Sequence, residues 1–176
     1  MKRILAAAVA AIALAAPAAA QQSAPFTGIR VEALGGYDAV NVPGLQNPDG
    51  FLYGLGIGYD VQTSNGLLLG VEADITDSTA KVKLPGPDLK AGRDIYVGGR
   101  IGTVVGDAVA LYAKAGYTNA RISYAGEGAN GDGFRLGAGV EYALGQNMFV
   151  KGEYRYSNYE ADLSRNQIVG GFGFRF

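Results

Sequence analysis

The chain contains 176 residues, of which 28 are Gly, and it has no Cys, His or Trp. The absence of Cys excludes disulfides and thiolate metal sites, and the absence of His excludes Ser-His or Cys-His catalytic pairs and histidine-bound metals. The 15 basic and 16 acidic residues nearly cancel, and the longest basic run is Lys2 with Arg3, so we expect no nucleic-acid-binding surface.

Residues 1–20 have the organisation of a secretory signal peptide. Lys2 and Arg3 precede an apolar stretch, residues 4–16, which is too short to span a bilayer as a helix. Residues 18–20 are all Ala and supply the small side chains of a cleavage site. We therefore expect a mature chain of residues 21–176 that forms one domain. Its formal net charge is −3, because two positive charges leave with the peptide.

From residue 26 onward the sequence alternates with a period of two, which is typical of strands with two different faces. In residues 26–38, for example, Val31 and Ala33 lie on one face, whereas Arg30 and Glu32 lie on the other. Similar segments follow, separated by Gly, Asn, Asp, Pro and Ser. The predicted strands cover residues 26–38, 51–62, 67–77, 93–104, 108–117, 134–144, 148–156 and 165–176.

The connections between these eight strands alternate in length. Those after the first, third, fifth and seventh strands hold about 12, 15, 16 and 8 residues, whereas residues 63–66, 105–107 and 145–147 form short turns. Outer-membrane barrels combine an even number of antiparallel strands with short periplasmic turns and longer external loops. The sequence therefore predicts an all-β fold, an eight-stranded antiparallel up-and-down transmembrane β-barrel with both termini in the periplasm.

Alternation alone does not say which face points outward, since a soluble barrel of the lipocalin type would bury the apolar face. Here the aromatic residues of that face gather near both ends of the strands, as two membrane interfaces require. Asp77 and Arg93 are the only charged residues at the alternate positions that form the apolar face. Both lie at strand ends next to the long loops. Both observations favour a membrane barrel. The expected interface aromatics are Tyr37, Phe51, Tyr53, Tyr59, Tyr117, Phe134, Tyr142, Tyr154 and Tyr156.

The opposite face of the strands carries seven basic and seven acidic residues. Such equality predicts mutual pairing, and the interior of an eight-stranded barrel is only wide enough for side chains to fill. We therefore expect a closed lumen held by salt bridges. Its members are Arg30, Glu32, Asp60, Glu72, Asp74, Asp94, Arg100, Lys114, Arg135, Glu141, Lys151, Glu153, Arg155 and Arg175.

Some of these carboxylates are close in sequence and raise the alternative of catalysis. Glu72 with Asp74, or Glu141 with Glu153, could in principle serve as acid and base. Basic neighbours are available to each of them, however, and no nucleophile or imidazole accompanies them. We therefore expect that the protein is not an enzyme, with no catalytic residue, no metal site and no cofactor.

The C-terminus carries a more specific pattern. Phe172, Phe174 and Phe176 occupy alternate positions, which resembles the signature read by the outer-membrane insertion machinery. Four further segments look like the recurring motifs of small porin-family outer-membrane barrels, the OmpA/OmpX-like and opacity-like proteins common in Alphaproteobacteria. These segments are residues 70–74, 111–117, 137–142 and 153–156. The resemblance covers essentially the whole mature chain.

This resemblance implies a monomeric barrel that supports envelope integrity and presents four surface loops. Its implied partners are outer-membrane lipid, lipopolysaccharide or lipooligosaccharide, and the insertion machinery during biogenesis. Two alternatives stay open, namely a pore for small solutes and a surface protein whose loops bind host cells or phage. Lys81, Lys83 and Lys90, within residues 78–92, could contact anionic headgroups, although a solvated loop explains them as well.

Overall fold

The computed structural model describes residues 25–41, 48–82, 89–124, 127–159 and 163–176. The predicted signal peptide and its cleavage site lie outside these residues. No helix in the described ranges is long and apolar enough to cross a membrane. The strands are β1 (Gly28–Asn41), β2 (Asp49–Gln62), β3 (Leu67–Ser78), β4 (Lys81–Val82), β5 (Leu89–Val105), β6 (Val109–Tyr124), β7 (Glu127–Ala143), β8 (Met148–Tyr159) and β9 (Ser164–Arg175).

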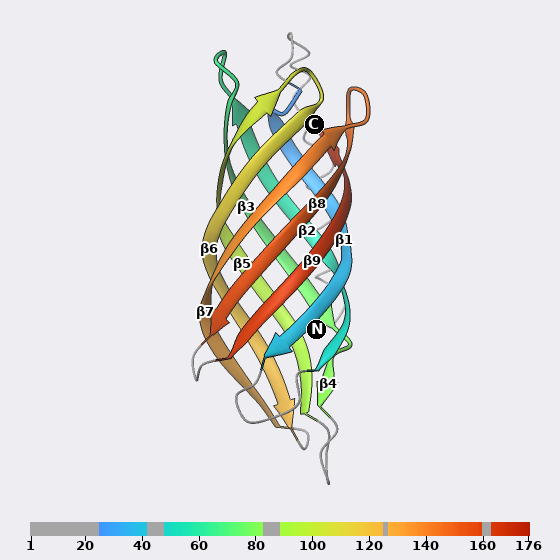
Figure 1. The fold of residues 1–176 in the computed structure, drawn as a ribbon, viewed down its shortest axis with the longest axis vertical. Helices are drawn as coiled ribbons and strands as arrows, with labels where there is room; N and C mark the ends of the chain where they lie inside the picture. The colour runs from blue at the N-terminus through green and yellow to red at the C-terminus, as the bar shows by residue number, and fades with distance from the viewer. Residues whose placement is uncertain (1–24, 42–47, 83–88, 125–126, 160–162) are drawn as a thin grey trace, which may run out of the picture.

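Eight of these strands close into a barrel (Figure 1). Their order is β3-β2-β1-β9-β8-β7-β6-β5, and an additional pairing between β3 and β5 completes the ring. All the pairings are antiparallel. The two-residue strand β4 pairs only with β5 and extends one hairpin. The predicted eight-stranded antiparallel barrel is confirmed, with β4 as an addition that the alternation did not reveal.

One end of the barrel holds the short turns, which lie at the top of Figure 1. Gly66, Gly106 and Gly145 take positive φ angles in these turns, a conformation that side chains disfavour. The C-terminus closes against β1 at this same end, because Ile29 N donates to Phe176 O (3.1 Å) and Phe176 N donates to Ile29 O (2.8 Å). We call this end the turn end, and the opposite end the loop end.

At the loop end the strands run further than the sequence predicts. The expected connection of about 16 residues after the fifth predicted strand is mostly sheet, because β6 continues to Tyr124 and β7 begins at Glu127. Alternation exists only where one face of a strand is apolar. Backbone pairing, in contrast, continues wherever two strands stay in register. The predicted strand ends at residues 117 and 134 are therefore wrong, and the hairpin projects beyond the apolar band.

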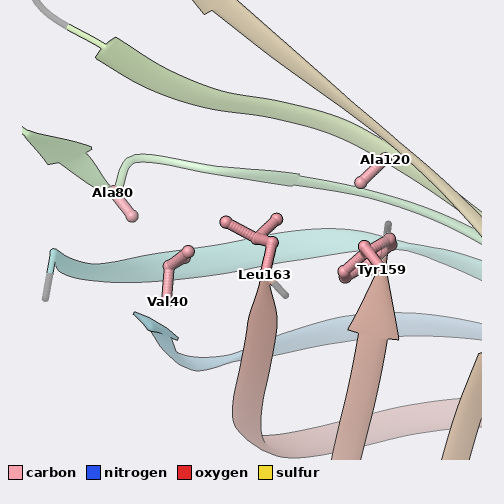
Figure 2. Packing of buried hydrophobic residues seen from close by; sticks show 5 residues of the cluster. All are labelled: Val40, Ala80, Ala120, Tyr159 and Leu163. Carbon is pink, nitrogen blue, oxygen red and sulfur yellow. The ribbon is translucent and has the colours of Figure 1, made fainter. Parts of the chain in front are cut away.

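The two faces of the barrel wall differ in composition. Large apolar side chains cover the outer face, where Val71 and Ile168 are more than 60% exposed. The inner face carries charged residues and three small apolar clusters. One cluster, at the loop end, joins Val40, Ala80, Ala120, Tyr159 and Leu163 (Figure 2). The other two are Phe26, Leu68 and Ala110 toward the turn end, and Leu34, Leu52 and Val169 on the β9-β1-β2 wall. The apolar face thus points outward, as the membrane interpretation predicts.

Glycines of the inner and outer faces offer a matched test of this packing. A Cβ at Gly98 would meet the Ala115 carbonyl oxygen at 2.5 Å and would overlap the Tyr96 hydroxyl, whereas a Cβ at Gly152 would meet nothing within 4 Å. Gly98→Ala should lower the free energy of unfolding by about 1 to 3 kcal/mol, because it overpacks the interior. Gly152→Ala should leave it nearly unchanged. Urea titration of the refolded barrel in lipid vesicles measures both, and equal effects of the two variants would contradict the packing.

Candidate functional site

The barrel interior gathers sixteen charged side chains, all of which are buried. Eight are basic and eight acidic, so their formal charges cancel. The structure places all fourteen predicted lumen residues there. The other two, Asp38 and Arg165, are not among the predicted residues and stand at the outer limits of the predicted strands. Asp38 lies an even number of positions from the inward residue Glu32 on β1, and Arg165 lies an even number of positions from the inward residue Gln167 on β9. This spacing is the signal that could have identified them.

Toward the turn end, three guanidinium groups surround one carboxylate. Asp60 accepts hydrogen bonds from Arg30 Nε (3.0 Å), Arg100 Nη2 (2.6 Å) and Arg175 Nη2 (3.0 Å). Glu141 shares two of these arginines, since it lies 2.9 Å from Arg100 Nη1 and 2.8 Å from Arg175 Nη2. Five strands contribute to this cluster, namely β1, β2, β5, β7 and β9. It therefore ties walls of the barrel that share no backbone ladder.

At mid-height, two lysines bridge the carboxylates of different strands. Lys114 Nζ lies 2.5 Å from Glu72 Oε1 and 3.0 Å from Glu153 Oε1. Lys151 Nζ lies 3.5 Å from the other oxygen of Glu153, and Arg155 pairs with the same residue. Because Glu153 also accepts from the Tyr112 hydroxyl (2.6 Å), its charge is solvated entirely by side chains.

Toward the loop end, Asp94 takes the central position. It accepts hydrogen bonds from Arg135 Nη2 (2.5 Å), Arg165 Nη1 (3.2 Å), the Tyr159 hydroxyl (2.7 Å) and Thr118 Oγ1 (2.6 Å). Hydrogen bonds from several donors to one carboxylate compensate for the solvation that it loses on burial. Tyr159 also belongs to the apolar cluster of Figure 2, so the ionic network and that cluster meet at this residue.

Two further connections join the three clusters. Arg30 pairs with Glu32 (2.9 Å) and with Glu72, which links the turn end to mid-height. Asp74 lies 3.4 Å from Arg155 Nη2 and 3.5 Å from Arg135 Nη1, which links mid-height to the loop end. Each of the sixteen buried charges has at least one opposite charge within 4.0 Å. Together they form one network that runs along the described interior.

Aromatic rings fill the space between these ions. Lys114 Nζ lies 4.4 Å and the Arg135 guanidinium 5.2 Å from the centre of the Tyr96 ring. At the turn end, Arg175 lies between two rings, 5.3 Å from Phe26 and 5.2 Å from Phe149. Such contacts stabilise cations that have lost water. Among the described residues no group of three or more His, Cys, Asp or Glu side chains could hold a metal ion.

On the outer face, eight of the nine expected interface aromatics are about half exposed, and Tyr156 is more covered. Three tyrosines near the loop end also donate hydrogen bonds to the neighbouring strand. The Tyr37 hydroxyl donates to Asp49 (3.0 Å), and that of Tyr154 donates to Asn166 (2.6 Å). The Tyr117 hydroxyl donates to Asp132 (2.5 Å). These rings therefore hold their polar ends toward the loop end, as residues at a membrane interface do.

The three alternating phenylalanines of the C-terminus also point outward. Phe172, Phe174 and Phe176 are 42 to 54% exposed, and the first two rings pack edge to face with centres 5.5 Å apart. Backbone hydrogen bonds between Phe176 and β1 hold the last residue in the closed wall. The pattern is thus presented on the surface at the seam where the first and last strands meet.

Comparison with known proteins agrees with this architecture. A model of the outer membrane protein beta-barrel domain matches residues 6–176. A 22 kDa outer membrane protein of Rhizobium leguminosarum bv. viciae is 30% identical over 150 residues, which cover 79% of this chain and 70% of that protein. The 31 kDa outer-membrane immunogenic protein of Brucella melitensis is 29% identical over 140 residues, or 68% of this chain. The matched part is only 57% of that relative's length.

Solved structures show the same fold. Neisserial surface protein A superposes with a TM-score of 0.67 at 21% identity, over 85% of this chain and 98% of that chain. Ail, the attachment invasion locus protein of Yersinia pestis, gives a TM-score of 0.58 at 19% identity, over 85% of this chain and 99% of that chain.

The three-arginine cluster allows a direct test of the network. Asp60→Asn removes the carboxylate that Arg30, Arg100 and Arg175 share, so it should lower the free energy of unfolding by about 3 kcal/mol or more, as expected for a broken buried ion pair. Asp49→Asn, at an exposed site beside Tyr37, serves as the matched control and should have little effect. Adding Arg175→Gln to Asp60→Asn should recover part of the loss. Unfolding in lipid vesicles is measured for all three, and a silent Asp60→Asn would contradict a network held by charge pairing.

Proposed function

Because the chain belongs to the outer membrane protein beta-barrel family and lies in the outer membrane of a Gram-negative bacterium, we propose that it acts as a structural barrel with a closed interior. Its role is to support the integrity of the envelope and to carry surface loops. The observation that carries this proposal is the single network of sixteen buried charges, each paired within 4.0 Å. Membrane lipid surrounds such a barrel, and a monomer suffices for it.

Two features support a closed interior. The ionic network occupies the described length of the barrel, and apolar side chains lie beyond it at both ends. An ion or solute that entered would have to separate existing pairs, and breaking one buried pair costs about 3 to 5 kcal/mol. This cost favours the structural role over the alternative of a small-solute pore.

A second candidate is a role of the loop end in contact with other cells or with phage. Its support is that β6 and β7 stay paired up to Tyr124 and Glu127, well beyond Tyr117 at the interface. The name of the Brucella relatives describes them as immunogenic, which fits an exposed surface. We propose that the loop end projects outward and that both chain ends are periplasmic. Enzymatic activity is not part of the proposal, because the sequence has no His and each buried carboxylate is ion-paired.

Conductance in planar bilayers tests the closed interior. The full-length refolded protein should show no stable open steps. Phe26→Ala, which removes one ring from the turn-end cluster, should also remain silent, because the ionic network still fills the interior. Heat-modifiable migration on SDS gels shows that the inserted protein is folded. Stable steps with the folded wild-type protein would exclude the closed interior and favour the pore.

Delivery to the membrane tests the proposed contact with the insertion machinery. Phe176→Ser should lower the amount of folded barrel in the outer-membrane fraction of cells, because it removes the terminal ring of the alternating pattern. The purified variant should still fold in detergent micelles, since the Phe176 side chain is 54% exposed and its backbone bonds to Ile29 remain. Val105→Ser, at another exposed outward position, is the control. Equal losses for the two variants in cells would contradict a specific signal.

A further inference from the structure

The contact between β1 and β9, which we call the seam, joins the two ends of the chain. Every other pair of neighbouring strands in the ring is connected along the chain by a turn, a loop or the short strand β4. At the turn end the seam finishes in two backbone hydrogen bonds between Ile29 and Phe176. Strands open most easily where few contacts hold their ends, so unzipping of a formed barrel would begin here.

The residues that precede and begin β1 cover this end of the seam from the inside. We call residues 25–28 the latch. Phe26 is fully buried in the apolar cluster of the turn end, among side chains of strands that do not adjoin β1 in the ring. These side chains are Leu68 of β3, Val104 of β5, Ala110 of β6 and Ala143 of β7. The latch thus reaches across the mouth of the barrel.

Polar contacts tie the latch to both neighbours of β1. On the β9 side, the Pro25 carbonyl oxygen accepts a hydrogen bond from Arg175 Nη1 (3.3 Å), and the centre of the Phe26 ring lies 5.3 Å from the same guanidinium. On the β2 side, Gln62 N donates to Thr27 Oγ1 (2.9 Å) and Phe26 N donates to Gln62 Oε1 (3.4 Å). The latch therefore connects β9 with β2 across β1.

Gly28 allows the chain to leave β1 at the seam itself. Its φ angle is 130°, which L side chains rarely adopt. A Cβ at this position would also overlap the carbonyl oxygen of Phe176, the residue that pairs with Ile29. Glycine at position 28 thus serves the latch and the last pair of the seam together.

The docking site of Phe26 is complete only in the closed ring. Its apolar walls come from four strands, and Arg175 comes from a fifth. Arg175 Nη2 is itself held by Asp60 of β2 (3.0 Å) and Glu141 of β7 (2.8 Å), so the guanidinium takes its place only when these strands have met. Contacts that form after the rate-limiting step of folding slow unfolding and leave the folding rate unchanged.

Phe149 offers a matched comparison for Phe26. Both rings are fully buried, and their centres lie at nearly equal distances from the Arg175 guanidinium, 5.2 Å for Phe149 and 5.3 Å for Phe26. Phe149 belongs to β8 and pairs with Gly173 of β9, so its surroundings assemble as these two consecutive strands pair. Phe26, in contrast, docks on strands with which its own segment does not pair. The two rings therefore separate burial beside Arg175 from the action of the latch.

We propose that residues 25–28 dock after the barrel has closed and hold the seam shut, so that they set the lifetime of the folded barrel and not its rate of folding. An open seam would expose unpaired backbone groups to lipid, which cannot form hydrogen bonds with them. The proposal goes beyond the structural role proposed above and does not rest on it, because it concerns closure of the ring and not the filling of the lumen.

Folding and unfolding rates in lipid vesicles test the latch. The full-length protein is transferred into and out of urea, and the closed form is counted by heat-modifiable migration on SDS gels. Phe26→Ala should unfold about 100-fold faster, the loss expected for one buried aromatic ring when all of it falls on unfolding. Its folding rate should stay nearly unchanged. Phe149→Ala is the matched control and should also slow folding. A Phe26→Ala variant that folds more slowly, or that unfolds at the wild-type rate, would overturn the proposal.

A second measurement follows the order of events and does not depend on the stability of the alanine variant. Because the sequence contains no Trp, Phe26→Trp introduces a single indole. During refolding, this indole should become protected from acrylamide only once the heat-modifiable closed form has appeared. Protection that precedes closure would contradict late docking. Phe26→Ala should remain silent in planar bilayers in either case, so failure of the latch and failure of the closed interior are separate results.

Discussion

The need to fill a narrow closed sheet with paired charges governs the rest of this structure. Alternation sends every second residue of each strand inward, and the interior of eight strands admits side chains but little else. A buried charge without a partner would cost several kcal/mol. The balance of eight basic against eight acidic residues follows from this constraint. Asp60 and Asp94 illustrate it best, because each compensates more than one arginine from strands far apart around the ring.

The same constraint explains why so many inward positions are glycine. A Cβ at Gly58 would lie 2.9 Å from the Arg30 guanidinium, and one at Gly137 would lie 3.0 Å from the Lys114 side chain. Because these ions are held by partners on other strands, they cannot move aside without loss of an ion pair. Large ions and empty positions therefore alternate across the interior. Glycine supplies the empty positions at a cost in strand propensity that the closed ladder offsets.

Much of this architecture is readable from the sequence, and the missing part has physical causes. The alternation of residues along each strand is enough to assign its inward face, including Glu72 and Arg155. It does not mark where a strand ends once both faces are polar, which is why the extension of β6 to Tyr124 does not follow from the sequence. The alternation also does not tell which inward charge pairs with which. Arg100 meets Glu141 across 41 positions of sequence, and such a contact depends on the register of several intervening strand pairs.

A neutral interior also changes how the outer surface acts on its surroundings. Since the sixteen inner charges cancel within a few ångströms, their combined field outside the barrel is small. The electrostatic character at the loop end is then set by the few outward charges, which include Arg93 and Asp77 on adjoining strands and Asp49 on another wall. A closed lumen with balanced charges therefore leaves electrostatic contact with the surroundings to the outward residues alone.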